Sequence, residues 1–378
     1  MHQIVFYPVG NGDTSQIILE NGKRILFDFR HLKKTENGEG PEIDLRGRLK
    51  DELSKARKKS FDVVAFTHSD KDHIENSTDF FELNHALKYQ GNGRIKIDQL
   101  WVPAAMIIET ATNNEQSDEF VIWRQEARFR LEKGEGIRVF SKPDKLKEWL
   151  ASKGLTVDSR RSLITDAGQV ADGFTLEKDG IEFFCHSPFI KHVDDGDDLR
   201  NPAALVFNVR LKMGVNTFDY LATGDSEWEV LEEIIQTTKD HNNEDRLAWD
   251  LFNLPHHCSY KALNSEKGEH ETIPAPLIKE LLLSGKEGAY LVSSSNPIQD
   301  DKAGREQVQP PHIQAKKCYC RHLKEVGGAK FFVTMEEPNA EKPEPLVFEI
   351  TSSGISRGQK AVVSAVATLT SAPAPRAG

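Results

Sequence analysis

The chain has 378 residues, and its 59 Asp and Glu against 49 Lys and Arg give a formal net charge of −10. Hydrophobic residues make up 38% of the chain, which is enough to build a core and too much for a disordered protein. No apolar run approaches the roughly 18 residues needed to span a bilayer, so a membrane-embedded protein is excluded. The acidic balance argues against a constitutive, sequence-independent nucleic-acid coat, but it leaves room for an enzyme with a local basic groove.

The N-terminal residues and the cysteine content indicate a compartment. MHQIVFYPVGNGD has no basic start and reaches a turn after a few apolar residues, unlike a signal peptide. Four cysteines in a chain of this length cannot form a disulfide framework, and reduced thiols suit the cytoplasm. We therefore expect a cytoplasmic protein.

The first residues alternate between short apolar runs and turns. They predict three strands, at His2–Tyr7, Ser15–Leu19 and Arg24–Asp28. Asn21-Gly22 is a type I′ hairpin signal, so the third strand should pair with the second. Helical spacing at Leu45–Lys59 is followed by FDVVAFT at Phe61–Thr67, a run typical of a strand buried on both faces. Within that helix, the basic run Lys55–Lys59 is predicted to be a charged helix face, with contact to nucleic acid as the alternative.

From about Gln99 to Gly154 the sequence is rich in helical patterns, the clearest at Glu115–Lys133 and Asp144–Lys153. They predict a helical insertion at about 104–160. The second half repeats the first pattern, with helices predicted at Glu227–Thr237 and Ile313–Val326. Strands are predicted at Ile181–Cys185, Ala203–Lys212, Thr217–Thr223, Leu251–Leu254, Tyr290–Ser294 and Lys330–Thr334. We expect a single domain over residues 1–358 and a flexible tail rich in Ala, Ser and Pro over residues 359–378.

The densest group of metal-ligand side chains follows the buried strand. THSDKDHIEN places His68, Asp70, Asp72 and His73 within six positions. Acidic and imidazole groups this close repel and compete for protons unless a cation neutralises them, and they are ligands that zinc, manganese or iron accept. A solvated charged turn is the alternative interpretation of this segment alone.

Two further strands end in ligand residues. FDYLAT is followed by Gly224-Asp225, and another apolar strand ends in Pro255-His256-His257. Sites in α/β sheets collect at one end of the strands, so groups far apart in sequence converge there. The three strand ends together predict one metal site.

The order H-x-D-x-D-H, then Gly-Asp, then Pro-His-His resembles the metallo-β-lactamase fold. In particular it is similar to the branch that includes the hydrolase domain of the competence DNA-uptake protein ComEC. VGNGDTSQIILENGKRILFDF (Val9–Phe29) resembles the opening V-G-x-G-D of that branch, followed by a hairpin that ends in aspartate. The resemblance runs from about residue 3 to about residue 312. It implies an α/β fold, an αββα sandwich of two mixed sheets with helices outside.

The resemblance also implies two divalent metal ions, zinc first and manganese as the alternative. His68 and Asp70 would bind the first metal, and Asp72 and His73 the second. Asp225 would bridge both.

His257 would complete the second site, in preference to His256, because the ligand of the family stands just before the small residue of HHGS. Here that residue is Cys258, in place of glycine. Asn201 falls where the superfamily often supplies a further histidine to the first site, and His186 is the alternative ligand there.

Three residues are expected near the substrate. Asn296 and His312 resemble the late asparagine and histidine of the family, which would face a phosphate. Lys261, a few residues beyond His257, is the basic side chain nearest to that ligand in sequence.

Two cations about 3.5 to 4 Å apart lower the pKa of a bridging water and stabilise the attacking and leaving oxygens. Asp72 would steer the resulting hydroxide and is the expected catalytic residue. The leading hypothesis is a phosphodiesterase or nuclease acting on DNA or RNA. A phosphodiesterase for a cyclic nucleotide or a phosphorylated head group is the alternative, and the charge of −10 favours it. A metal-binding partner protein without catalysis is the third hypothesis, and the presence of all six ligand residues argues against it.

Overall fold

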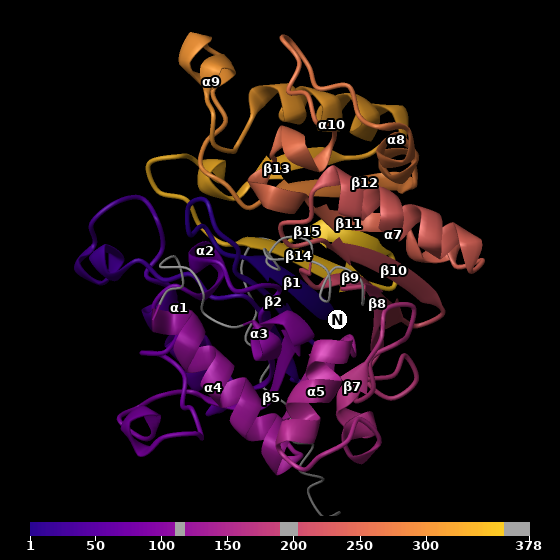
Figure 1. The fold of residues 1–378 in the computed structure, drawn as a ribbon. Coiled ribbons are helices and arrows are strands. Elements are labelled where there is room, and N and C mark those ends of the chain that lie inside the picture. Colours follow the sequence, from indigo (N-terminus) through magenta and orange to yellow (C-terminus); the bar gives the residue numbers. More distant parts are fainter. Residues whose placement is uncertain (110–117, 190–202, 359–378) are drawn as a thin grey trace, which may run out of the picture.

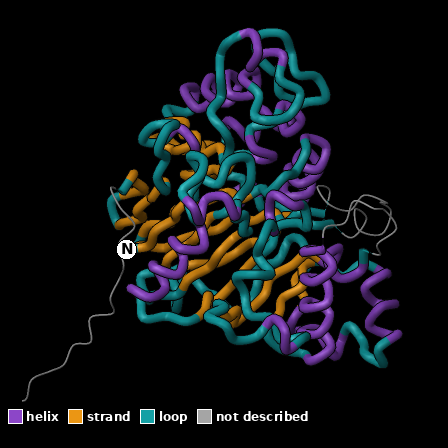
Figure 2. Tube along the Cα trace, turned by 90° about the vertical axis from the view of Figure 1, so that its left-hand side faces the viewer, coloured by secondary structure: helices purple, strands orange, loops and turns teal. Residues whose placement is uncertain are grey.

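The computed structural model describes residues 1–109, 118–189 and 203–358. Two β-sheets face each other at its centre (Figures 1 and 2). The first sheet has nine strands in the order β15-β14-β1-β2-β3-β4-β5-β6-β7. Their bounds are β1 His2–Phe6, β2 Ser15–Ile18, β3 Arg24–Phe27, β4 Ser60–Ala65, β5 Lys96–Pro103, β6 Ile137–Phe140, β7 Ile164–Thr165, β14 Leu346–Thr351 and β15 Gly354–Arg357.

The second sheet has six strands in the order β13-β12-β11-β10-β9-β8. Their bounds are β8 Ile181–Ser187, β9 Val206–Met213, β10 Asn216–Ala222, β11 Trp249–Asn253, β12 Gly285–Ser293 and β13 Lys330–Val333. Strands β10 to β13 pair in parallel, as do β3 to β7 in the first sheet. Parallel neighbours end at the same edge of a sheet, which is what gathers the residues that follow them.

Side chains that alternate between the two faces of each strand form one core between the sheets. Ile4 and Phe6 of β1 pack with Phe183 and Phe207 of the second sheet, while Val5 points to the opposite side. In β4, Val63 and Ala65 face inward and Val64 outward. Because side chains of a strand alternate between the two faces, both faces of these strands are covered.

Helices cover the two outer faces (Figure 1). Those over the first sheet are α1 Leu45–Lys55, α3 Ala104–Ile108, α4 Asp118–Lys133 and α5 Asp144–Ser152; those over the second are α7 Trp228–Asp240, α8 Pro276–Leu283 and α10 Ile313–Glu325. The shorter helices are α2 Lys71–Ile74, α9 Lys302–Glu306, η1 Lys33–Asn37, η2 Leu87–Tyr89, η3 Asp158–Leu163, η4 Glu244–Arg246, η5 Pro255–His257, η6 Tyr260–Ala262 and η7 Thr334–Glu336. The expected αββα sandwich is therefore confirmed.

The segment 104–160 differs from a purely helical insertion. It contains the helices expected there, but its strand β6 pairs in parallel with β5, so the segment extends the first sheet. Among the described residues, no helix is both long and apolar enough to cross a bilayer. The expected tail, residues 359–378, lies outside the described residues.

Candidate metal centre

Three strand ends bring the predicted ligands together. The apolar run of β4 continues to Thr67, and the one-turn helix α2 then places Asp72 and His73 side by side. Asp225 follows β10, and His257 follows its parallel neighbour β11. The two sheets meet here, because the Leu205 N–H donates a hydrogen bond to the Thr67 carbonyl oxygen.

Asp225 lies at the centre of the cluster. Its Oδ1 is 3.3 Å from His73 Nε2, and its Oδ2 is 3.5 Å from His257 Nε2 and 3.8 Å from His68 Nε2. Asp72 Oδ2 lies 3.1 Å from His257 Nε2. Asp70 Oδ2 lies 3.8 Å from His68 Nε2. Ligand atoms of Asp72, His73, Asp225 and His257 all fall within 4.8 Å of one another.

The Nδ1 atoms of the three imidazoles are held by neighbours outside the cluster. His257 Nδ1 donates to the Ser294 carbonyl oxygen at 2.9 Å, which leaves Nε2 as the unprotonated nitrogen of a neutral ring. His73 Nδ1 lies 2.8 Å from Asp28 Oδ2, and His68 Nδ1 lies 3.1 Å from the Thr67 hydroxyl. A carboxylate or carbonyl on the outer nitrogen is the usual arrangement for a metal-binding histidine.

Several ligand atoms are buried without a hydrogen bond. Within the described part of the chain, His68 Nε2, His73 Nε2 and Asp225 Oδ1 have no hydrogen-bond partner. Buried polar atoms are normally satisfied, and leaving them unpaired is unfavourable. Their convergence on one point, and their imidazole and carboxylate chemistry, fit divalent transition metals.

The charges of the cluster depend on one another. Burial alone would lower the pKa of His73, but Asp225 and Asp28 outweigh it and raise that pKa well above its ordinary value. Burial alone would raise the pKa of Asp225, yet His257 and His73 hold it well below its ordinary value. Burial, with the neighbouring His73, lowers the pKa of His68 to about 3. Cations would therefore displace protons from His73 and His257, as metal binding to such groups does.

Sequence reasoning missed two carboxylates behind the ligands. Asp28 accepts hydrogen bonds from the Thr67 N–H and hydroxyl, both at 2.7 Å, besides its contact with His73. Asp13 is buried, and its ligand atom lies within 4.8 Å of ligand atoms of Asp28 and His73. Both residues lie in the opening motif of the resemblance, where Asp13 ends the V-G-x-G-D turn and Asp28 ends the hairpin. These positions are the sequence signal that could have identified them.

Two glycines allow the backbone to approach the ligands. Gly224 has φ +51°, and an added Cβ would lie 3.3 Å from Thr67 Cβ. At Gly12 an added Cβ would lie 2.7 Å from the Asp72 carbonyl oxygen and closer still to the Arg30 side chain. Substitution at either position would displace a strand end or the turn that carries Asp72.

The turn that presents His257 has an unusual backbone. His256, His257 and Cys258 have φ values of 50°, 53° and 65°, in the left-handed region that favours glycine. This explains why a glycine suits the position of Cys258. His256 is not part of the ligand cluster among the described residues, and its Nδ1 lies 3.9 Å from Glu227 Oε1.

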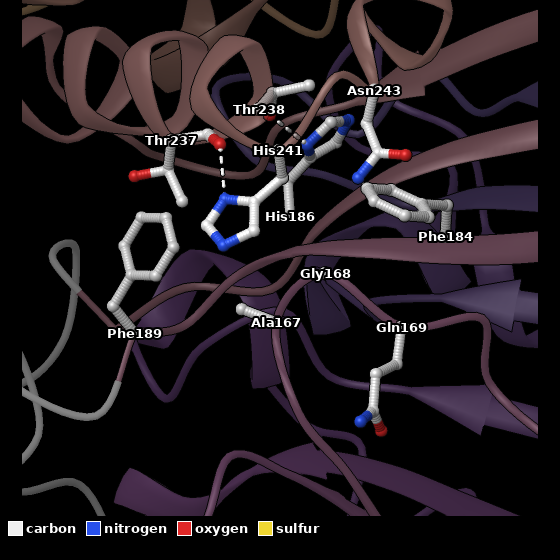
Figure 3. A pocket seen from close by; sticks show the side chains of 10 residues that line it. All are labelled: Ala167, Gly168, Gln169, Phe184, His186, Phe189, Thr237, Thr238, His241 and Asn243. Atoms are coloured by element: carbon white, nitrogen blue, oxygen red, sulfur yellow. Dashed lines mark hydrogen bonds between the residues drawn. The ribbon is translucent and has the colours of Figure 1, made fainter.

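The structure does not bring His186 to the cluster. Its Nδ1 lies 3.2 Å from the Thr238 hydroxyl and its Nε2 lies 3.1 Å from the Arg246 carbonyl oxygen, so both nitrogens are engaged. It lines a separate cavity of about 320 Å³ between β8 and the end of α7, with Phe184 and His241 (Figure 3). Asn201, the other candidate for this role, lies outside the described residues.

The three residues expected near the substrate differ in how free their side chains are to contact a phosphate. Lys261 is half exposed, with Nζ 3.7 Å from Glu227 Oε1. Asn296 is exposed, and its N–H donates to Asn11 Oδ1 at 2.7 Å, which ties it to the opening turn. His312 is 1% exposed; Nε2 lies 3.1 Å from the Val308 carbonyl oxygen, and Nδ1 accepts from the Tyr260 N–H. With both nitrogens engaged, His312 holds two loops together and has no ring atom free for a phosphate.

No known protein family and no curated protein matches this sequence. Solved structures to which the chain is similar include unliganded yeast PDE1, with a TM-score of 0.43 and 11% identity over 88% of this chain and 96% of that one. A diphosphatase from the PhnP family has a TM-score of 0.34 and 11% identity over 92% and 98% of the two chains. A class B3 di-zinc metallo-β-lactamase from an Alaskan soil metagenome has a TM-score of 0.30 and 9% identity over 66% and 76%. The site residues are therefore assigned from the geometry of this chain.

Proposed function

We propose that this chain is a metal-dependent hydrolase that cleaves phosphodiester bonds, with DNA or RNA as its substrate. The observation that carries the proposal is the convergence of His68, His73 and His257 Nε2 on the Asp225 carboxylate. Each ring is oriented by a contact of its other nitrogen.

The resemblance assigns these residues to two metal positions. His68 and Asp70 would hold one divalent metal. Asp72, His73 and His257 would hold a second, and Asp225 contacts residues of both sets. Bound divalent metals would supply a water of lowered pKa and stabilise the charge that develops on the phosphate.

The exposed fractions of the ligand side chains favour one direction for the approach of a substrate. The side chains of His68, His73, Asp225 and His257 are at most 5% exposed, whereas those of Asp70 and Asp72 are 26% and 35% exposed. A substrate therefore approaches over the two aspartates. The His257 hydrogen bond lowers the pKa of Asp72 against the effect of burial, so its carboxylate is ionised at neutral pH and can accept a hydrogen bond that orients an attacking water.

The choice of a phosphodiester rests on the resemblance of the motif order to the branch that includes the DNA-uptake protein. A small phosphodiester such as a cyclic nucleotide is the second candidate substrate. The net charge of −10 favours it, because a long polyanion is repelled unless basic groups offset that charge locally.

Reconstituted protein tests both candidates. The chain would be stripped with a chelator, reloaded with zinc or manganese, and assayed on single-stranded DNA, duplex DNA, RNA and cyclic nucleotides. We expect metal-dependent cleavage of at least one nucleic acid. Cleavage of cyclic nucleotides alone would favour the second candidate, and metal binding without hydrolysis of any phosphodiester would contradict the proposal.

A further inference from the structure

A basic groove lies at the opposite end of β4 from the metal centre. It has a volume of about 550 Å³ and is formed by the end of α1, the turn after it, and the residues that lead into β5. The ten residues that line it are Lys50, Leu53, Ser54, Arg57, Lys58, Lys59, Gly93, Arg94, Ile95 and Lys96. Six of these are Lys or Arg and none is acidic, in a chain whose net charge is −10.

Part of this charge is uncompensated. Lys58 pairs with Asp62 at 2.7 Å, Lys96 lies 3.8 Å from Glu82, and Arg94 donates to backbone carbonyls. Arg57 and Lys59 are exposed, and neither has a carboxylate partner in the part of the chain that the structure describes. Two cationic side chains thus remain available to a phosphate.

Arg57 occupies a position that favours glycine. The Arg57 N–H donates to the Ser54 carbonyl oxygen and the Lys58 N–H to that of Leu53, the hydrogen bonds of a Schellman motif at the end of α1. Arg57 stands at its left-handed position with φ +56°. A side chain there costs backbone energy that glycine would not, so Arg57→Gly should not destabilise the turn.

The groove and the metal centre are separated by the length of β4. Lys59 precedes this strand and Thr67 follows it, which at about 3.3 Å per residue places them roughly 25 Å apart. One nucleotide cannot span that distance, whereas about eight nucleotides of a B-form strand can.

We propose that this basic groove binds the phosphate backbone of a nucleic-acid strand at a distance from the bond cleaved at the metal centre. The proposal rests on the proposed function and deepens it, because it selects a polymer over a cyclic nucleotide. Lys and Arg at the groove release counterions from the strand and offset the net negative charge locally.

Binding would be measured on the full-length chain in chelator, by anisotropy of labelled single-stranded and duplex oligonucleotides of 6 and 30 nucleotides over a range of salt. The variant is Arg57→Gly with Lys59→Gln. The control is Lys302→Gln with Arg161→Gln, which removes the same charges from side chains that are 88% and 80% exposed elsewhere. Arg57→Gly relieves the turn, so loss of the fold would not explain a loss of binding; the melting temperature is recorded for both.

We expect the groove variant to bind 30-mers at least about tenfold more weakly at 0.1 M salt, with a salt slope smaller by about 1.4 to 1.8. The control should match wild type, and the 6-mers should be affected least. The proposal would be overturned if the groove and control variants weakened binding equally. It would also be overturned if the wild type bound no oligonucleotide, or if it bound anionic lipid vesicles and no oligonucleotide. Hydrolysis of bis(p-nitrophenyl) phosphate by the metal-loaded variant should match wild type. Absence of this hydrolysis in wild type would contradict the proposed function, whereas loss of oligonucleotide binding alone concerns only the groove.

Discussion

The ligand cluster and the cavity around His186 both use a histidine at or near the end of a strand of the second sheet. His257 follows β11 and His186 lies in β8. His257 has one nitrogen on the Ser294 carbonyl oxygen and the other toward Asp72 and Asp225. His186 has both nitrogens on neutral groups, the Thr238 hydroxyl (Figure 3) and the Arg246 carbonyl oxygen.

The difference indicates which surroundings suit a histidine to metal binding. Position at a strand end is shared, so it does not decide the role. The partners of the two nitrogens decide it, because a ligand needs one nitrogen oriented and the other unprotonated and facing further ligands. Burial then lowers the pKa of His186 to about 4, since no carboxylate opposes it and the charge of Arg246 adds to the effect.

The largest expected effect is on catalysis at the exposed side of the cluster. Asp72→Ala removes a carboxylate that would both bind metal and orient water, so kcat should fall by roughly three orders of magnitude or more. The fold should persist, because this side chain is 35% exposed. Turnover and the circular dichroism spectrum would be measured together; activity within tenfold of wild type would contradict the role of Asp72.

A smaller effect is expected from the carboxylate behind His73. In Asp28→Asn an amide nitrogen can face His73 Nδ1, which moves the ring proton to Nε2 and blocks the ligand atom. Metal affinity should fall by about 10- to 100-fold, measured by competition with a chromogenic chelator. The control is Asp219→Asn, a buried carboxylate in β10 that pairs with Arg210 and Lys286. Equal losses in the two variants would show that any buried charge change disturbs the site.

His186→Gln should change stability and leave kcat within about threefold of wild type. The folded pKa of His186 lies near 4, below the ordinary value near 6.5, so the unfolded chain binds the proton first as pH falls. Its contribution to stability is therefore full above about pH 6.5 and is lost as pH falls toward 4, a change on the order of 3 kcal/mol at most.

Urea unfolding at several pH values should show a shallower pH dependence of the unfolding free energy in the variant. His241 lines the same cavity and Arg246 contacts His186 through its carbonyl oxygen, and both stay unchanged in the variant. Loss of metal from the variant would place His186 among the ligands.

The smallest effect is expected at Lys261. Its side chain is 53% exposed and its Nζ lies 3.7 Å from Glu227 Oε1, so it can offer a screened charge to a phosphate near His257. Lys261→Ala should raise KM for nucleic acid by a few fold, flatten its salt dependence, and leave metal content unchanged. An unchanged KM at low salt would remove Lys261 from the substrate site.

The sequence predicted ten of the strands and the convergence of the candidate ligands because both depend on local pattern. Apolar runs marked β4, β10 and β11, and the residues directly after them formed the cluster. The same reasoning missed β5, β6, β7, β14 and β15. β14 pairs with β1 from the other end of the chain, and β6 lies in a stretch dominated by helical patterns.

The hydrogen-bond partners of individual side chains could not be predicted from the sequence and were identified only in the structure. Asp28 and His73 are 45 residues apart, and His312 and Tyr260 are 52 apart. Nothing in the local pattern indicated that His312 and His186 had both nitrogens engaged by other elements. Likewise, the basic residues at the end of α1 and after it line a groove because β5 pairs with β4, which places Arg94 and Lys96 beside them.

The most direct test of the central claim is the metal content of the full-length chain. Elemental analysis after gentle purification, and again after dialysis against zinc or manganese, should find at least one transition-metal equivalent in wild type and substantially less in His257→Ala. No transition metal in either wild-type sample would contradict the metal centre. Equal metal content in wild type and His257→Ala would contradict the assignment of its ligands.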